Sequence, residues 1–131
     1  MIRFDARLFA VALCVAAAPA VAADFDGSRA LICSAIETHE CSVGTSCVRG
    51  LAEDINVPQF IRLDFAAKTL SARGRSTPIK NYARADGMLV IQGFENKRAV
   101  SITISEESGK LVGAVAADEE GFMIFGACTP L

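Results

Sequence analysis

Residues 88–105 read MLVIQGFENKRAVSITIS, and this stretch decides the fold class because its second half alternates strictly between apolar and polar side chains. A period of two predicts a strand with one face in a core and the other in water. When the stretch is folded back at Asn96-Lys97, Glu95 falls opposite Arg98 as an opposite-charge cross-strand pair. The same register places the apolar residues of both halves on one face, pairing Leu89 with Ile104, Ile91 with Ile102, and Gly93 with Val100.

The chain on either side of this hairpin continues the pattern of short alternating segments separated by turn residues. We expect the other strands at 30–41, 61–65, 69–73, 78–84, 111–117 and 122–128. Short strands at this spacing predict an all-β antiparallel meander. Closure into a small barrel of about eight strands would remove its two open edges. A two-sheet sandwich is the alternative that the same pattern permits.

The length of the turn before the central hairpin decides which residues of the preceding strand face the core. A three-residue loop at 85–87 keeps Lys80 and Arg84 off the apolar face of the hairpin. A two-residue loop, Asp86-Gly87, would place both cations on that face. We therefore expect the three-residue loop, with glycine in the left-handed conformation.

The first 23 residues carry the pattern of a secretory signal peptide. Arg3 and Arg7 precede an apolar run at 8–18, and small residues follow at 20–23. The run is shorter and richer in alanine than a spanning helix, which needs ~20 strongly apolar residues. We expect cleavage before Asp24 and a periplasmic or secreted mature protein, with a retained membrane anchor as the alternative.

The predicted mature chain, residues 24–131, has the length of one domain and a net charge of −3. A mildly acidic domain is not expected to take nucleic acid as its partner. Its sequence contains no segment long and apolar enough to be a spanning helix. We expect a single barrel domain that is a monomer.

Four cysteines remain in the mature chain, and in an exported domain this even count predicts two disulfides. Cys33 and Cys41 in one extended strand would lie about 26 Å apart, beyond the ~7 Å reach of a disulfide. Residues 42–46 can turn and bring Cys41 to Cys47, which leaves Cys33 for Cys128. The predicted disulfides are therefore Cys41–Cys47 and Cys33–Cys128, the second of which ties the first strand to the last.

The last hairpin, 111–128, is apolar on both faces, which is not the pattern of a sheet with one face in water. Met123 and Phe125 project away from the predicted core. Either segment 42–58, a predicted loop with a helical turn near 51–55, covers them or another molecule does. We favour the loop, and Met123 and Phe125 are the candidate partner patch of the other interpretation.

The segment 68–84 contains no acidic residue and five cations: Lys68 and the four candidate anion-binding residues Arg73, Arg75, Lys80 and Arg84. On adjacent strands they would form a basic stripe for phosphate, lipopolysaccharide or an acidic protein. The interpretation we favour is a solvated outer face whose cations discourage edge pairing.

The sequence shows no catalytic motif. His39, the single histidine of the chain, lies between Glu37 and Cys41. Strand alternation sends Glu37 and His39 to one face and Glu40 to the other, whereas a zinc site needs three or four convergent ligands. We predict a surface histidine, no catalytic residue, no metal and no cofactor.

Three features together carry a resemblance: the signal peptide, an early Cys…Cys-x5-Cys segment, and the motifs FIRLDFAAKTL at 60–70 and FGACTP at 125–130. They resemble a group of small exported bacterial proteins of unknown function with a calycin-like barrel, over nearly the whole mature chain. In architecture the chain is also similar to small periplasmic inhibitors of c-type lysozyme. Their Ser-Gly-x-x-Tyr-like loop would correspond to 108–112, where Val112 replaces the tyrosine.

Compact barrels of this kind commonly bind rather than catalyse. We expect a non-enzymatic exported module that binds a small apolar ligand or a protein. The alternatives are an inhibitor or envelope-protection protein acting on a secreted enzyme, and a small hydrolase. An enclosed apolar cavity would favour ligand binding, and its absence would favour a protein partner on a surface patch.

Overall fold

The computed structural model describes residues 24–131, and the predicted signal peptide at 1–23 lies outside the described residues. The elements are β1 (Leu31–Ser42), β2 (Val48–Gly50), the 3-10 helix η1 (Ala52–Ile55), β3 (Phe60–Asp64), β4 (Thr69–Ala72), β5 (Arg75–Pro78), β6 (Asn81–Ala85), β7 (Met88–Glu95), β8 (Arg98–Ser105), β9 (Lys110–Ala116) and β10 (Glu120–Pro130). Every strand pairing is antiparallel, as predicted.

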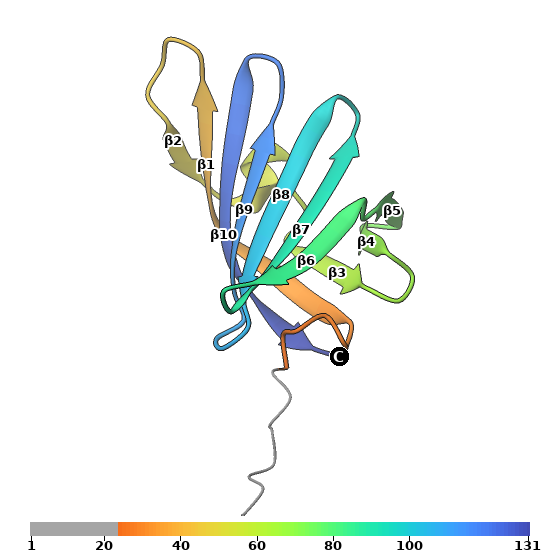
Figure 1. Ribbon diagram of the computed structural model, residues 1–131. Coiled ribbons are helices and arrows are strands. Elements are labelled where there is room, and N and C mark those ends of the chain that lie inside the picture. Colours follow the sequence, from red (N-terminus) through yellow and green to blue (C-terminus); the bar gives the residue numbers. More distant parts are fainter. Residues whose placement is uncertain (1–23) are drawn as a thin grey trace, which may run out of the picture.

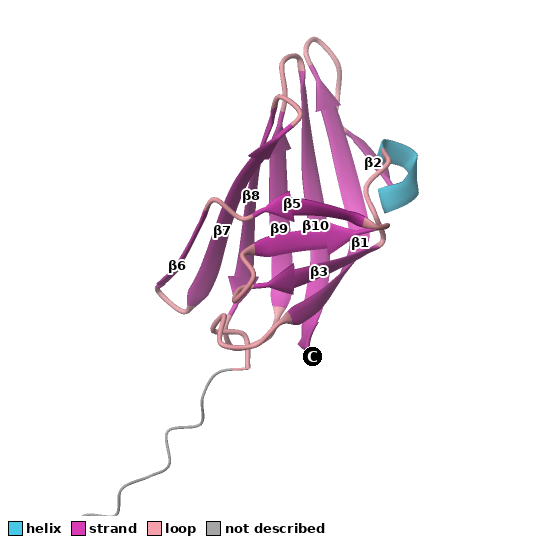
Figure 2. Ribbon diagram, turned by 90° about the vertical axis from the view of Figure 1, so that its right-hand side faces the viewer, coloured by secondary structure: helices cyan, strands magenta, loops and turns pink. Residues whose placement is uncertain are grey.

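Nine strands form one continuous sheet in the order β5-β4-β3-β1-β10-β9-β8-β7-β6, and β2 pairs with the second half of β1. The first and last long strands, β1 and β10, are neighbours in the middle of this sheet. Its two edges, β5 and β6, follow one another in the sequence. The sheet curls into an open half-barrel (Figure 1), and β3, β4 and β5 cross in front of the longer strands (Figure 2).

The predicted closed barrel of about eight strands is not what the sheet forms. Along the described chain no ladder joins β5 to β6 or to β7. A side-chain bond links β5 to β7, in which the hydroxyl of Thr77 donates to the carboxylate of Glu95. In the connection after β5, the backbone N–H of Lys80 donates to the carbonyl of Gln92 at 2.9 Å. The half-barrel therefore stays open along the line where a ladder would have closed it.

The central hairpin has the predicted register along its whole length, including Glu95 opposite Arg98. Its turn residues, Asn96 and Lys97, have φ values of 49° and 63°. Both lie in the left-handed region that a two-residue type I′ turn requires.

The turn before this hairpin is shorter than predicted. Ala85 pairs directly with Met88, so the loop consists of Asp86 and Gly87 and brings Arg84 onto the apolar face. The expectation of a three-residue loop was wrong because β6 is an edge strand. An arginine there can reach a carboxylate, and the Arg84 Nε lies 2.6 Å from an oxygen of Glu106.

Strand β5 was missed in the sequence, where Pro78 was expected to open a strand that continues to Arg84. A two-residue turn at Arg73-Gly74, with φ values of 48° and 74°, returns the chain alongside β4. Pro78 is instead the last residue of β5. Because proline has no N–H to donate, the end of an edge strand is one of the few sheet positions it can occupy.

The ladder between β1 and β10 contains one irregularity, where Ile36 is an extra residue between Ala35 and Glu37. Gly126 lies opposite Ala35 at this bulge. A Cβ atom on Gly126 would overlap the carbonyl oxygen of Ser34 and lie 3.1 Å from its carbonyl carbon. The close approach of the two strands therefore requires glycine at this position.

Both predicted disulfides are present. Cys33 and Cys128 face each other in the β1–β10 ladder, and Cys41 is bonded to Cys47 across the turn that follows β1. Two disulfides are compatible with an oxidising compartment.

Within residues 24–131, no helix has the length and apolarity needed to cross a membrane.

The part of segment 42–58 that follows β2 lies against the inner face of the sheet. The hydroxyl of Thr38, a fully buried residue, donates to the carbonyl of Leu51 at 3.1 Å. Ala52 belongs to the buried core, and Val57 packs against that core. The predicted helical turn is confirmed as η1, which lies beside β2 (Figure 2), whereas the expectation that this loop covers the outer face is wrong.

The inner face divides into two parts along the strands. The end near the C-terminus is filled by side chains that have no exposed surface, namely Leu31, Leu63, Leu89 and Ile104. Phe25, from the segment before β1, packs against the same core. Toward the β7–β8 turn, two glycines replace side chains in the inner rows, Gly113 between Ile102 and Ile124, and Gly93 opposite Val100.

We predict that Gly126→Ala destabilises the fold by ~2–3 kcal/mol or more, because the added methyl group forces β1 and β10 apart. The matched control is Gly121→Ala in the same strand, where a Cβ would make an ordinary 3.6 Å contact with the Val115 carbonyl oxygen. Urea unfolding of both variants measures the difference. Equal midpoints for Gly126→Ala and Gly121→Ala would show that the strands do not approach so closely.

Candidate functional site: an apolar pocket in the half-barrel

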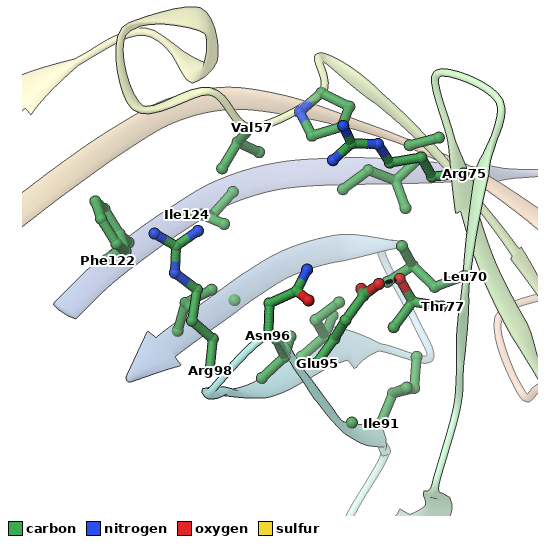
Figure 3. Close-up of a pocket in the computed structure, with 18 of the residues that line it drawn as sticks. Val57, Leu70, Arg75, Thr77, Ile91, Glu95, Asn96, Arg98, Phe122 and Ile124 are labelled. Carbon is green, nitrogen blue, oxygen red and sulfur yellow. Dashed lines mark hydrogen bonds between the residues drawn. The ribbon is translucent and has the colours of Figure 1, made fainter. Parts of the chain in front are cut away.

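The unfilled part of the inner face forms a pocket of about 430 Å³ (Figure 3). Its floor comes from the central strands and consists of largely buried aliphatic side chains, among them Ile91, Ile102, Leu111 and Ile124. Val57 and its neighbours after η1 form one wall, and β4 and β5 form another. The volume lies within the range of small-molecule sites, ~300–1,000 Å³.

Gly113 deepens the floor. It lies in a cross-strand row between Ile102 and Ile124, where an alternating strand would normally place a side chain. A Cβ atom at this position would lie 3.5–3.8 Å from atoms of these two isoleucines, which is ordinary contact. The glycine is therefore not required by the backbone, and its effect is to leave space.

Exposed polar residues gather on the rim. They come from the β4–β5 turn, which carries Arg73 and Arg75, and from the β7–β8 turn, which carries Glu95, Asn96 and Arg98. Figure 3 shows side chains from the two turns on opposite sides of the pocket mouth. The pocket thus combines an apolar interior with a charged entrance.

The two sides of the rim differ in how their charges are balanced. Arg98 donates to Glu120 at 3.1 Å, and its guanidinium lies 5.9 Å from the centre of the Phe122 ring. Arg73 has a neutral partner, the side-chain oxygen of Asn56 at 3.4 Å. Among the described residues, Arg75 forms no hydrogen bond or ion pair.

The four cations of the predicted basic stripe do not line one surface. Arg73 and Arg75 belong to the pocket, whereas Lys80, in the connection between β5 and β6, and Arg84 do not line it. Arg84 instead bonds Glu106, with Nε–Oε1 and Nη2–Oε2 distances of 2.6 and 2.8 Å. The stripe interpretation, which we did not favour, needs the four cations on neighbouring strands. The chain instead turns at Gly74 and passes after Pro78 from one edge strand, β5, to the other, β6.

The Arg84 pair stabilises the filled end of the half-barrel. The hydrogen bond from Arg84 lowers the pKa of Glu106 below its ordinary value, and the same bond raises the pKa of Arg84. Asp26 lies 3.9 Å from the Arg84 guanidinium, and its pKa is lowered first by hydrogen bonding with Ser28. These groups join the N-terminal segment, β6 and the β8–β9 turn in one ion-pair cluster.

His39 lies on the outer face, as predicted from alternation. Its Nε2 is 2.8 Å from a carboxylate oxygen of Glu37, whose second oxygen lies 2.5 Å from Arg49. Hydrogen bonds from Arg49 and then His39 lower the pKa of Glu37. The imidazole also contacts the Phe125 ring edge-on, with 5.8 Å between the ring centres.

In residues 24–131 no three histidine, cysteine or acidic side chains are placed to hold a metal.

Met123 and Phe125, the candidate partner patch of the interpretation that we did not favour, lie on this outer face, on the side of the sheet opposite to η1 and Val57. Phe125 is 39% exposed and Met123 is half-buried. The bulged Ile36, at 63% exposure, lies beside Phe125 in the ladder. The outer face therefore has exposed apolar side chains that no segment of the described chain covers.

The pocket itself was missed in the sequence. Its lining comes from strands that lie far apart in the chain, and it depends on which edges stay unpaired. Gly93 and Gly113 at inward-facing positions were the one local signal, because glycine in a strand often marks a site that a ligand or another backbone approaches closely.

No protein-family model matches the chain, and comparison with curated proteins and with solved structures finds no match.

We predict that serine substitutions at two neighbouring phenylalanines of β10 have unequal effects. Phe122 is 9% exposed on the inner face, so Phe122→Ser should cost ~3 kcal/mol or more. Phe125→Ser should cost ~1–2 kcal/mol, because much of that ring is already in water. Thermal unfolding compares the two. Similar losses would show that both faces of β10 are covered in the folded protein.

Proposed function

We propose that the protein is a non-enzymatic binding module that takes a small apolar ligand into the pocket of the half-barrel. The observation that carries this proposal is an unfilled apolar floor inside a domain of 108 residues. The pocket has an open mouth, so it is not the enclosed cavity named above as the sign of ligand binding. Its aliphatic floor and its volume of about 430 Å³ nevertheless match small-molecule sites, and a ligand on the floor would shield these side chains from water.

The chemistry of the floor supports binding over catalysis. Its aliphatic side chains carry no acid, base or nucleophile, and enzymes need such groups within hydrogen-bond reach of the reacting atoms. The signal-peptide pattern and the two disulfides support a place of action in the periplasm or outside the cell.

A second candidate function is favoured by the outer face. The exposed Ile36 and Phe125 side chains suit a protein partner, as expected of an inhibitor of a secreted enzyme. The two candidates are separable because they use opposite faces of the sheet. Phe125→Ser would weaken the binding of a protein partner to the outer face and leave ligand binding in the pocket unchanged.

We predict that the uncharged dye N-phenyl-1-naphthylamine binds the mature protein with a rise in fluorescence, and that filling the floor removes this binding. Gly113→Leu should abolish it, since the added atoms extend beyond a tolerated Cβ into the pocket. Gly113→Ala should weaken it less. The matched control is Ala114→Leu, which adds its side chain to the outer face of the same strand.

Thermal unfolding of each variant shows whether it is folded when it is tested. Dye binding that survives in a folded Gly113→Leu protein, or that is lost equally in Ala114→Leu, would contradict ligand binding in this pocket.

A further inference from the structure

We infer that the ligand of the pocket is an amphiphile with a single aliphatic chain and an anionic head group, and that Arg73 and Arg75 bind the head group. This inference rests on the proposed function and specifies its ligand class. It follows from the charge of the rim, the position of the two arginines, and the composition of the floor.

The rim carries an excess of positive charge in a domain that is acidic overall. Three arginines and one glutamate line the pocket, whereas the mature chain has a net charge of −3. Arg98 is paired with Glu120, and the carboxylate of Glu95 accepts a hydrogen bond from the hydroxyl of Thr77 in β5. The other charged lining residues are Arg73 and Arg75, so with Glu95 the rim retains an excess of one positive charge.

Neither of these two arginines is paired with a carboxylate in the described structure. Arg73 is held by the neutral side chain of Asn56, and Arg75 extends over the pocket mouth (Figure 3). The other arginines that flank the sheet differ: Arg49 is bonded to Glu37 and Arg84 to Glu106. A guanidinium presents a planar set of donors that matches a carboxylate or a phosphate. Two guanidinium groups without a carboxylate partner at a pocket mouth therefore suit an anionic group.

The β4–β5 turn fixes the backbone positions from which the Arg73 and Arg75 side chains extend. Arg73 and Gly74 form the two-residue turn, and Arg75, the next residue, opens β5, which pairs with β4. A tight turn of this kind leaves little freedom to the two Cα positions, so both side chains start from the same corner of the rim. A head group there lies above the floor, with its chain directed toward Gly113.

The floor favours an aliphatic chain over a flat ring or a nucleotide. Among the described lining residues, Phe122 is the single aromatic one, and its ring face is occupied by Arg98. Sites for bases and aromatic ligands normally supply stacking partners and polar groups in the interior. Here the polar groups are confined to the rim, which matches a molecule with one charged end.

The test is displacement of N-phenyl-1-naphthylamine by four probes with the same twelve-carbon chain: dodecanoate, dodecyl phosphate, dodecanol and dodecyltrimethylammonium. We expect the two anions to displace the dye at concentrations about ten- to a hundredfold lower than dodecanol, because each can accept charged hydrogen bonds. The anion that displaces at the lower concentration identifies the head group as carboxylate or phosphate.

The variant Arg73→Gln with Arg75→Gln should bring both anions to the level that dodecanol reaches on the same variant. The charge-matched control is Lys80→Gln with Lys110→Gln, two exposed cations that do not line the pocket. This control should retain the preference for anions. The four replaced side chains are exposed, and melting temperatures confirm that each variant is folded.

The results separate the two proposals. If dodecanol or the cationic probe displaces the dye at the same concentration as the anions, the head-group assignment is overturned. The proposal that the pocket binds a ligand is unaffected by that result. An equal loss in the lysine control also overturns it, because the preference would then reflect net charge. Failure of all four probes to displace a dye whose binding depends on Gly113 overturns the single-chain amphiphile. Dye binding that does not depend on Gly113 overturns the proposed function itself.

Discussion

The antiparallel ladder between β1 and β10 joins the first and last long strands of residues 24–131 in the middle of the sheet, and the rest of the structure depends on it. It is reinforced by the Cys33–Cys128 disulfide and by the close approach at Gly126. Because the first and last strands are paired, the free edges fall in mid-chain, between β5 and β6. The opening of the half-barrel, and with it the pocket, therefore lies where the chain passes from one edge to the other.

Much of this arrangement could be predicted from local patterns. The register of residues 88–105 follows from one alternation that satisfies two strands at once, and the structure confirms it pair by pair. The disulfide partners follow from the extended geometry of β1, which separates Cys33 from Cys41. These inferences succeed because each depends on residues whose separation is fixed by a strand or a short turn.

The remaining features depend on contacts between distant segments. The sequence alone predicts Arg84 on the outer face, because a cation on an apolar face needs a partner. That partner is Glu106, which lies in a later turn and is brought close only by the fold. The part of segment 42–58 after β2 lies on the inner side of the sheet, where the Thr38 hydroxyl donates to the carbonyl of Leu51 and Ala52 is buried in the core. For the candidate site, Arg73 and Arg75 were recognised as cations. Their place at a pocket mouth follows from the sheet order, which no local pattern reveals.

The central claim is that the inner face of an unclosed sheet holds an aliphatic chain. Nuclear Overhauser effects between bound dodecanoate and isotope-labelled isoleucine methyl groups test it most directly. Ile102 and Ile124 line the pocket, and Ile36 projects from the outer face as an internal control. The account predicts contacts from the chain to Ile102 and Ile124 and none to Ile36. Contacts to Ile36 without contacts to the two floor residues would contradict it.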